Sequence, residues 1–177
     1  MRNVASDKRE VGMMIDWIKA RRSIRKYSPG PVTDEQIRTM LEAAMAAPSA
    51  SNVKPWEFVV VRDAALRQQL AQVHPWSGMA ADAPVVFVIC GRPSDSDHWV
   101  EDCSAATENL LLAATALGLG GVWVAVYPRS QREDHVRAIL HLPNTWHPLC
   151  LVPIGHPAET KAARTQYDPQ RVHYDAL

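Results

Sequence analysis

A chain of 177 residues with 47% hydrophobic and 21% charged residues is long enough for one globular domain, which we expect to span residues 1–177. Its 19 basic and 19 acidic residues cancel, so a surface that binds nucleic acid is not expected. The three cysteines lie far apart and include no CxxC pair, which argues against a disulfide framework and a zinc site.

The first predicted elements are two helices separated by a break. Apolar residues recur at helical spacing over residues 11–20 and predict a helix that runs into an arginine-rich segment. Proline and glycine at residues 28–31 interrupt the pattern. Thr33 and Gln36 then form a capping box, and the apolar face that follows predicts a second helix that stops near Pro48.

Strands follow these helices. β-Branched and aromatic residues predict a strand over residues 56–61, and residues 64–73 have the pattern of a short helix. Residues 85–90 are apolar on both faces, so we expect a strand in the centre of a sheet.

The longest predicted helix covers residues 99–117. Residues 110–114 make its middle apolar nearly all the way round, and such a helix must be covered on all sides. In so short a chain, one sheet and its neighbouring elements do not suffice to bury every face of this helix. The pattern therefore favours a second subunit and a homodimer.

The last third of the chain continues to alternate between helix and strand. The glycines of residues 118–121 end the long helix, because glycine accepts the left-handed conformation at a helix end. Helices and strands interleave without an internal repeat, so the predicted fold class is α+β around one sheet. The remaining predictions are strands over residues 122–127 and 150–154, a helix over residues 130–140, and a tail from residue 156 that runs over the surface or over a partner.

The arginine-rich segment is a candidate phosphate site. Residues 21–25, Arg-Arg-Ser-Ile-Arg, collect three guanidinium groups and a hydroxyl. Arginine suits phosphate because its planar fork donates two hydrogen bonds at once and stays charged at any working pH. The same string is also typical of a solvated helix end, a basic patch or a kinase target, so the residues alone leave these alternatives open.

Other catalytic motifs are not recognised. The glycines of residues 118–121 follow a predicted helix and precede a strand, the reverse of a dinucleotide-binding loop. The seven histidines have no paired spacing, so no metal is expected, and no serine or cysteine lies in a nucleophile motif. If the protein is an enzyme, we expect a cofactor to carry the chemistry.

Hydropathy and cysteine usage bear on the cell compartment. No apolar run approaches the ~18 residues that a membrane span needs. The first ten residues are polar and mixed in charge, unlike a signal peptide. We therefore expect a soluble protein of the reducing cytoplasm that has no membrane partner.

Two segments in order resemble the nitroreductase family of FMN-dependent oxidoreductases. Residues 21–27 resemble its RRSxRxF motif, and residues 47–61 resemble its APSxxNxQPWxFVVV loop and strand. Residues 102–110, 116–123 and 152–157 add matches in the expected order. This chain departs from the usual pattern at Lys54, where many members have glutamine, and at Tyr27, which stands in for phenylalanine.

The resemblance implies a nitroreductase-like α+β fold, with a central, mostly antiparallel sheet flanked by helices. It also implies an intertwined homodimer with two FMN sites at the interface. For residues 47–52 a plain helix-exit loop stays open as an alternative, and for Arg164 a solvated arginine. The implied FMN contacts are Arg21, Arg22, Ser23 and Arg25 at the phosphate and ribityl chain, Pro48, Ser49, Ala50 and Asn52 at the flavin of the opposite subunit, the backbone of Val124 and Ala125 against the flavin, and Arg164 at the phosphate.

The activity that the resemblance implies is a ping-pong reaction. NAD(P)H passes hydride to flavin N5 and leaves, and an electron-poor small molecule such as a nitroaromatic or a quinone takes its place. No catalytic side chain is then required, because the flavin carries the hydride. The alternative is an FMN-binding protein without NAD(P)H turnover, such as a flavin carrier, sensor or flavin-modifying protein.

Overall fold

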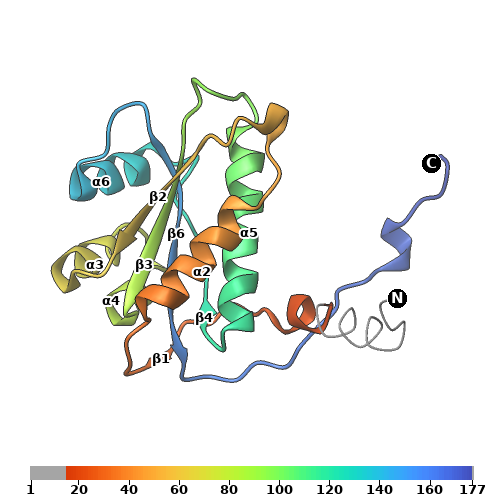
Figure 1. Ribbon diagram of the computed structural model, residues 1–177, viewed down its shortest axis with the longest axis horizontal. Helices are drawn as coiled ribbons and strands as arrows, with labels where there is room; N and C mark the ends of the chain where they lie inside the picture. Colours follow the sequence, from red (N-terminus) through yellow and green to blue (C-terminus); the bar gives the residue numbers. More distant parts are fainter. Residues whose placement is uncertain (1–14, 177) are drawn as a thin grey trace.

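The computed structural model describes residues 15–176. Helices cover both faces of one sheet, with α2 and α5 on one side and α3, α4 and α6 on the other (Figure 1). Residues 15–20 are helical, and residues 11–14 of the helix predicted there lie outside the described residues. The elements are β1 (Tyr27–Ser28), α2 (Asp34–Met45), η1 (Ala50–Asn52), β2 (Trp56–Val61), α3 (Ala64–Leu70), α4 (Met79–Asp82), β3 (Val85–Gly91), α5 (Trp99–Ala116), β4 (Gly120–Gly121), β5 (Val124–Ala125), α6 (Ser130–Leu140), β6 (His147–Pro157) and η2 (Pro169–Arg171).

The sheet is antiparallel and is organised around β6. Its strand order is β1-β6-β3-β2, and the short strands β4 and β5 also pair with β6. In register, Phe87 of β3 lies opposite Val152 of β6 and Val60 of β2. Every residue of β3 is buried, which confirms the central strand predicted from its apolar pattern.

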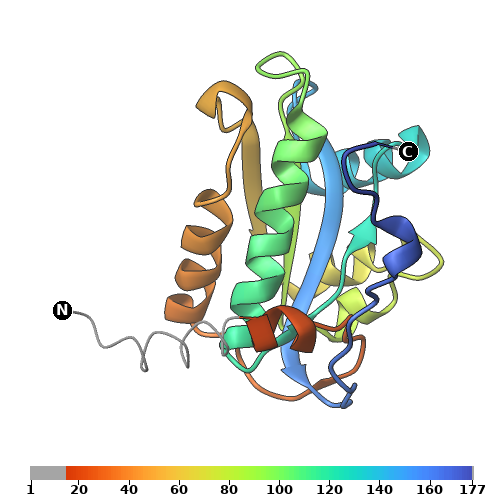
Figure 2. The same ribbon diagram turned by 90° about the vertical axis from the view of Figure 1, so that its right-hand side faces the viewer.

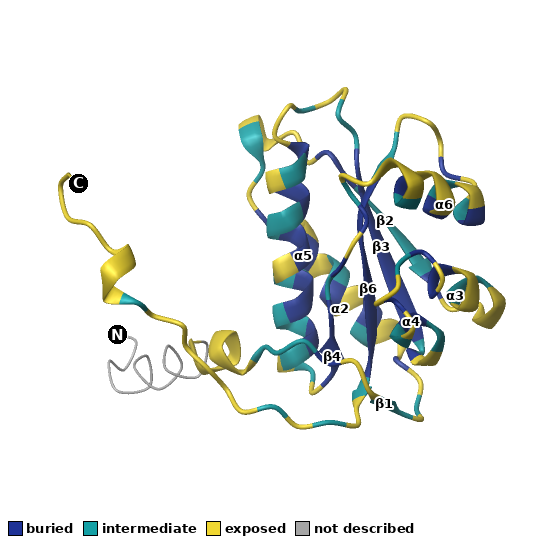
Figure 3. Cartoon of the chain, turned by 180° about the vertical axis from the view of Figure 1, so that it is seen from behind, coloured by how far each residue is buried: buried dark blue, intermediate teal, exposed yellow. Residues whose placement is uncertain are grey.

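Each face of the sheet has its own core. Because side chains alternate along a strand, Phe87 and Ile89 of β3 join the core beneath α2 and α5. Their neighbours Val86 and Val88 join the core beneath α3, α4 and α6. Figure 3 shows the buried stripe of α5 facing the sheet, in dark blue.

Helix α2 begins at the predicted capping box. The Thr33 hydroxyl accepts the N–H of Gln36 at 3.2 Å, and the Gln36 side chain accepts the N–H of Thr33 at 3.0 Å. The helix buries Ile37, Met40 and Ala44 against the core. These contacts confirm the start of the second predicted helix.

Two strand predictions differ from the structure. The strand predicted over residues 122–127 is replaced by the dipeptide strands β4 and β5, and pairing begins earlier, at Gly120. A Cβ added at Gly120 would lie 2.7 Å from Cβ of Ile24, so glycine allows two backbone segments to come closer than periodicity could indicate. Strand β6 also runs beyond the predicted residues 150–154, to His147–Pro157.

The chain after β6 leaves the body of the fold. It is exposed over most of its length and extends away from the sheet (Figures 1 and 3). Its beginning is attached, because the N–H of Ala158 donates to the carbonyl of Lys26 at 2.9 Å. Within residues 15–176, no helix combines the length and hydrophobicity that a membrane crossing requires.

Candidate functional site

The arginine-rich segment of residues 21–25 is attached to the sheet through β4. Ser23 forms a parallel bridge with Gly121, and the N–H of Ile24 donates to the carbonyl of Gly121 at 3.0 Å. The side chain of Ile24 is buried in the space that Gly120 leaves open. Ile24, the apolar residue of the segment, therefore attaches the segment to the core.

Tyr27 fixes the far end of this segment. Its hydroxyl lies 2.9 Å from the carbonyl oxygen of Ile24 and 3.0 Å from that of Pro153. Burial raises the pKa of the tyrosine well above its usual value, so the hydroxyl stays protonated and remains a donor. A phenylalanine at this position would lack both contacts.

The tail folds back onto the same segment. The Arg22 guanidinium donates to the carbonyl of Ala162, and the Lys161 ammonium donates to the carbonyl of Ser23. The backbone N–H of Arg25 donates to Oε1 of Glu159 at 2.6 Å. These contacts cross more than 130 positions of sequence.

Arg164 joins this region, and Lys161 is a cation that sequence reasoning missed. The N–H of Arg164 donates to the carbonyl of Lys19 at 3.1 Å, beside the predicted phosphate segment. The tail has no periodicity and no matching motif, so nothing in the sequence singled out Lys161. A hollow of about 350 Å³ lies between Arg22, Gly120 and Lys161.

Charged groups of both signs meet at the arginine-rich segment. The Glu159 carboxylate is held first by the Arg25 N–H and then by Lys161, whose Nζ lies 3.2 Å away, and these contacts lower the pKa of Glu159. Arg21 pairs through Nε with Oε1 of Glu108 on α5 at 3.1 Å. Guanidinium, ammonium and hydroxyl groups are the donors that phosphate oxygens prefer, and a phosphate here would share or replace the contacts that Arg21, Arg22 and Lys161 make within the chain.

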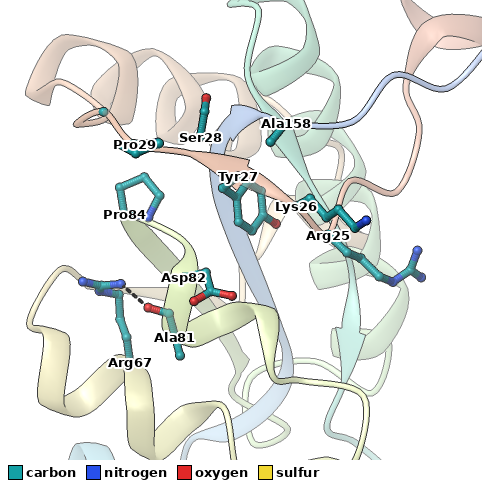
Figure 4. Close-up of a pocket in the computed structure, with 11 residues that line it drawn as sticks. Arg25, Lys26, Tyr27, Ser28, Pro29, Arg67, Ala81, Asp82, Pro84 and Ala158 are labelled. Carbon is teal, nitrogen blue, oxygen red and sulfur yellow. Dashed lines mark hydrogen bonds between the residues drawn. The ribbon is translucent and has the colours of Figure 1, made fainter.

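A second hollow borders the other side of the segment. It measures about 670 Å³ and lies between the residues of β1 and the α3–α4 region. Figure 4 shows Arg25 and Lys26 pointing away from Arg67, whose guanidinium donates to the carbonyl of Ala81. Arg67 is therefore engaged in holding the end of α4.

The loop of residues 47–54 lies at the opposite end of α5. The N–H of Ala50 donates to Oδ1 of Asp102 at 2.9 Å, and the N–H of Lys54 donates to Oγ of Ser49 at 3.0 Å. Helix α5 has 18 residues and so separates this loop from Gly121 by roughly 27 Å (Figure 1). One chain therefore does not bring Pro48, Ser49, Ala50 and Asn52 to the arginine-rich segment, whereas a site shared between two copies could use both.

Strand β5 offers a backbone edge. Val124 lies opposite Leu151 and Ala125 opposite Cys150, and within residues 15–176 no strand pairs with the other edge of β5. Val124 is buried and Ala125 is exposed. The Ala125 carbonyl accepts a hydrogen bond from the Arg132 guanidinium at 3.1 Å, so this edge of β5 is bordered by α6 rather than by another strand.

The cysteines do not form a reactive site. Cys90, Cys103 and Cys150 are buried and free. Burial raises the pKa of Cys90 and of Cys103 to about 12, so these thiols stay protonated and are poor nucleophiles. Within the described part of the chain, no group of three or more His, Cys, Asp or Glu side chains has the arrangement of a metal site.

Comparison with known proteins identifies the family. The sequence model of the Nitroreductase family matches residues 18–74 and 72–156. The chain belongs to the nitroreductase family. This confirms the resemblance inferred from residues 21–27 and 47–61.

Two nitroreductase relatives cover nearly the whole chain. A protein of Methanothermobacter thermautotrophicus with the provisional name NADH dehydrogenase/NAD(P)H nitroreductase is 42% identical over 92% of this chain and 86% of its own length. The structure of an FMN-dependent nitroreductase from Clostridium difficile is 32% identical, with a TM-score of 0.88 over 92% of this chain and 100% of that chain. An NADPH-flavin oxidoreductase of Vibrio harveyi is 32% identical over 81% of this chain and 65% of its own length. The nitroreductase-like α+β fold is therefore confirmed.

Proposed function

We propose that this nitroreductase-family protein is a flavin-dependent NAD(P)H oxidoreductase with FMN as its cofactor. The observation that carries the proposal is the donor cluster at residues 21–25, which bridges to β4 and is assembled with Lys161 from the tail. Relatives named NADPH-flavin oxidoreductase and FMN reductase support the same activity.

Residues of this chain would bind FMN through charged contacts with its phosphate and through packing against its flavin ring. The cofactor phosphate would meet Arg21, Arg22, Ser23 and Arg25, with Arg164 and Lys161 from the tail. The flavin ring would lie against the backbone of Val124 and Ala125. Residues Pro48, Ser49, Ala50 and Asn52 of a second copy would close the site from the other side.

A homodimer is part of this proposal. An apolar groove lies between α2 and α5 and is closed at one end by Trp17 and Ile18. The short helix of residues 15–20 crosses the end of α5 there (Figure 2). Leu112 and Ala113 line it, although Leu110 and Leu111 beside them are buried within the chain. A second copy that covers this groove would remove the exposed apolar surface from water.

The proposed acceptors are electron-poor small molecules such as nitroaromatics and quinones. The chemistry that bound FMN supplies is hydride acceptance from NAD(P)H and electron delivery to a second ligand. The protein binds the cofactor, orients it and offers one position that donor and acceptor occupy in turn. None of the described cysteines needs to act, which agrees with their protonated state.

Initial-rate kinetics test this mechanism. NAD(P)H and a quinone or nitroaromatic acceptor are varied together, and product formation is followed by absorbance. If donor and acceptor occupy one position in turn, plots of reciprocal rate against reciprocal donor concentration should be parallel lines at different acceptor concentrations. Intersecting lines would show that donor and acceptor bind together and would contradict the ping-pong order.

A further inference from the structure

Asp102 of α5 is a buried carboxylate whose contacts reach beyond its own helix. Asp102 is only 6% exposed to solvent. Its Oδ1 accepts the N–H of Ala50 at 2.9 Å, and its Oδ2 accepts the hydroxyl of Ser96 at 3.3 Å. No ion pair within residues 15–176 includes Asp102.

Burying the carboxyl group of Asp102 costs free energy of folding. A buried carboxyl group loses its hydration, and its hydrogen bonds together with its place in the first turn of α5 replace part of it. An apolar residue at this position of α5 would avoid the cost. The contact with Ala50 is therefore the feature of Asp102 that calls for an explanation.

The loop that Asp102 holds has an unfavourable backbone. Ser51 has φ 49°, Asn52 φ 57° and Lys54 φ 57°, so three non-glycine residues close together adopt the left-handed conformation. Asparagine tolerates this region, whereas serine and lysine adopt it at a cost. Such a conformation persists only where surrounding contacts determine it.

Asp102 supplies such a contact at the start of the strained turn. Ala50 is the first residue of η1, and its N–H has no partner within that short helix. Asp102 accepts a hydrogen bond from this N–H, and Ala50 directly precedes Ser51, the first of the left-handed residues. Ser51 and Asn52 are exposed, and the loop that contains them lies at the end of α5 (Figure 1).

We propose that Asp102 is a positioning residue for the flavin site: it fixes the loop of residues 48–54 so that Ser49 and Asn52 are presented to the FMN of a second copy. The inference rests on the proposed function. Asp102 acts through the loop and does not itself touch the cofactor. The burial of a polar side chain at this place in α5 is thereby explained by the preorganised binding loop that it supports.

The test compares FMN affinity and fold stability in a set of variants. Asp102→Ala removes the acceptor, and Asp102→Leu removes it while filling the volume. Asp102→Asn keeps an acceptor oxygen for the Ala50 N–H. Glu101→Ala, an exposed acid one residue earlier on α5, is the matched control.

We expect the FMN dissociation constant of Asp102→Ala and Asp102→Leu to rise roughly tenfold, the size of a lost hydrogen bond to a charged group. Asp102→Asn and Glu101→Ala should stay close to the parent. Adding Ser51→Gly to Asp102→Ala should recover part of the affinity, because glycine accepts the left-handed conformation without strain. Circular dichroism of the bound flavin should show the same order of variants.

Three results would overturn the inference. The first is an unchanged FMN dissociation constant in both variants that lack the acceptor. The second is a loss of affinity that Ser51→Gly does not reduce at all. The third is failure of both Ala and Leu variants to fold while Asp102→Asn folds, which would assign Asp102 to the core of α5. If the parent protein itself does not bind FMN, the proposed function fails instead.

Discussion

At the scale of residues, Arg21 and Arg25 are the cations at the two ends of the proposed phosphate segment. Replacing both by alanine removes charge-assisted hydrogen bonds of roughly 1.5–3 kcal/mol each. We expect the double variant to lose most of its FMN on desalting, measured as flavin absorbance per subunit. Arg38→Ala with Arg62→Ala, two arginines outside the segment, should leave the flavin content unchanged. A full complement of flavin in the Arg21/Arg25 variant would remove these residues from the site.

Glu159 gives the same region a pH dependence. The Arg25 N–H and Lys161 lower the pKa of this carboxyl below its usual value of 4.5. A lowered folded-state pKa stabilises the protein above the unfolded pKa, and this contribution is lost as the pH falls through the folded value. We therefore expect the stability advantage of the parent over Glu159→Gln to shrink below the usual pKa of glutamate, in chemical denaturation at a series of pH values. An advantage that grows on acidification would contradict this assignment.

At the scale of elements, the capping box of α2 is a local feature with a local test. Thr33→Ala removes the acceptor for the Gln36 N–H and should cost about 1 kcal/mol of unfolding free energy in urea denaturation. Thr39→Ala, in the middle of the same helix, is the control. Its hydroxyl bonds only to the Glu35 carbonyl of the preceding turn, so the change should be near zero. Equal losses in both variants would show that the cap has no special role.

Elements with a strong local pattern were the predictable ones. Strand β2 and helix α6 have the bounds that their sequence patterns predict, and α2 begins at its capping box. The dipeptide strands β4 and β5 were not predictable as such, because Gly120 permits a close approach of Ile24, about 100 positions earlier. Strand β1 is likewise defined by its pairing with the end of β6.

At the scale of the whole molecule, the candidate site depends on contacts that sequence patterns do not encode. The residue pattern alone indicated the arginine-rich segment as a candidate phosphate site and a strand around Val124. The motif resemblance assigned the loop of residues 47–52 and the backbone at Val124 to the flavin. Only the folded chain shows that Lys161 and Glu159 lie against this segment. It also shows that the loop contacts the start of α5 whereas the segment extends from the middle of α5 to Gly121 beyond its end, which agrees with an FMN site proposed to form between two copies.

The apolar groove along α5 provides the test of that dimer. Leu112 lines the groove and is only partly buried within the chain, so Leu112→Glu should leave the fold intact and disrupt the association. We expect sedimentation velocity to show a dimer for the parent and a monomer for the variant, with loss of bound FMN. Glu108→Gln, which changes the charge of an exposed residue one turn earlier on α5, should remain dimeric. A monomeric parent, or a dimer that Leu112→Glu does not affect, would place the interface elsewhere.

Anaerobic titration of the purified protein with NADPH and then NADH, followed by its absorption spectrum, tests the flavin oxidoreductase function most directly. We expect a yellow protein that carries an FMN in each subunit and whose flavin absorbance bleaches when the donor is added. A yellow protein that neither donor bleaches would contradict NAD(P)H-dependent reduction and favour a flavin carrier or sensor. A colourless protein that cannot be reconstituted with FMN would contradict the flavin site itself.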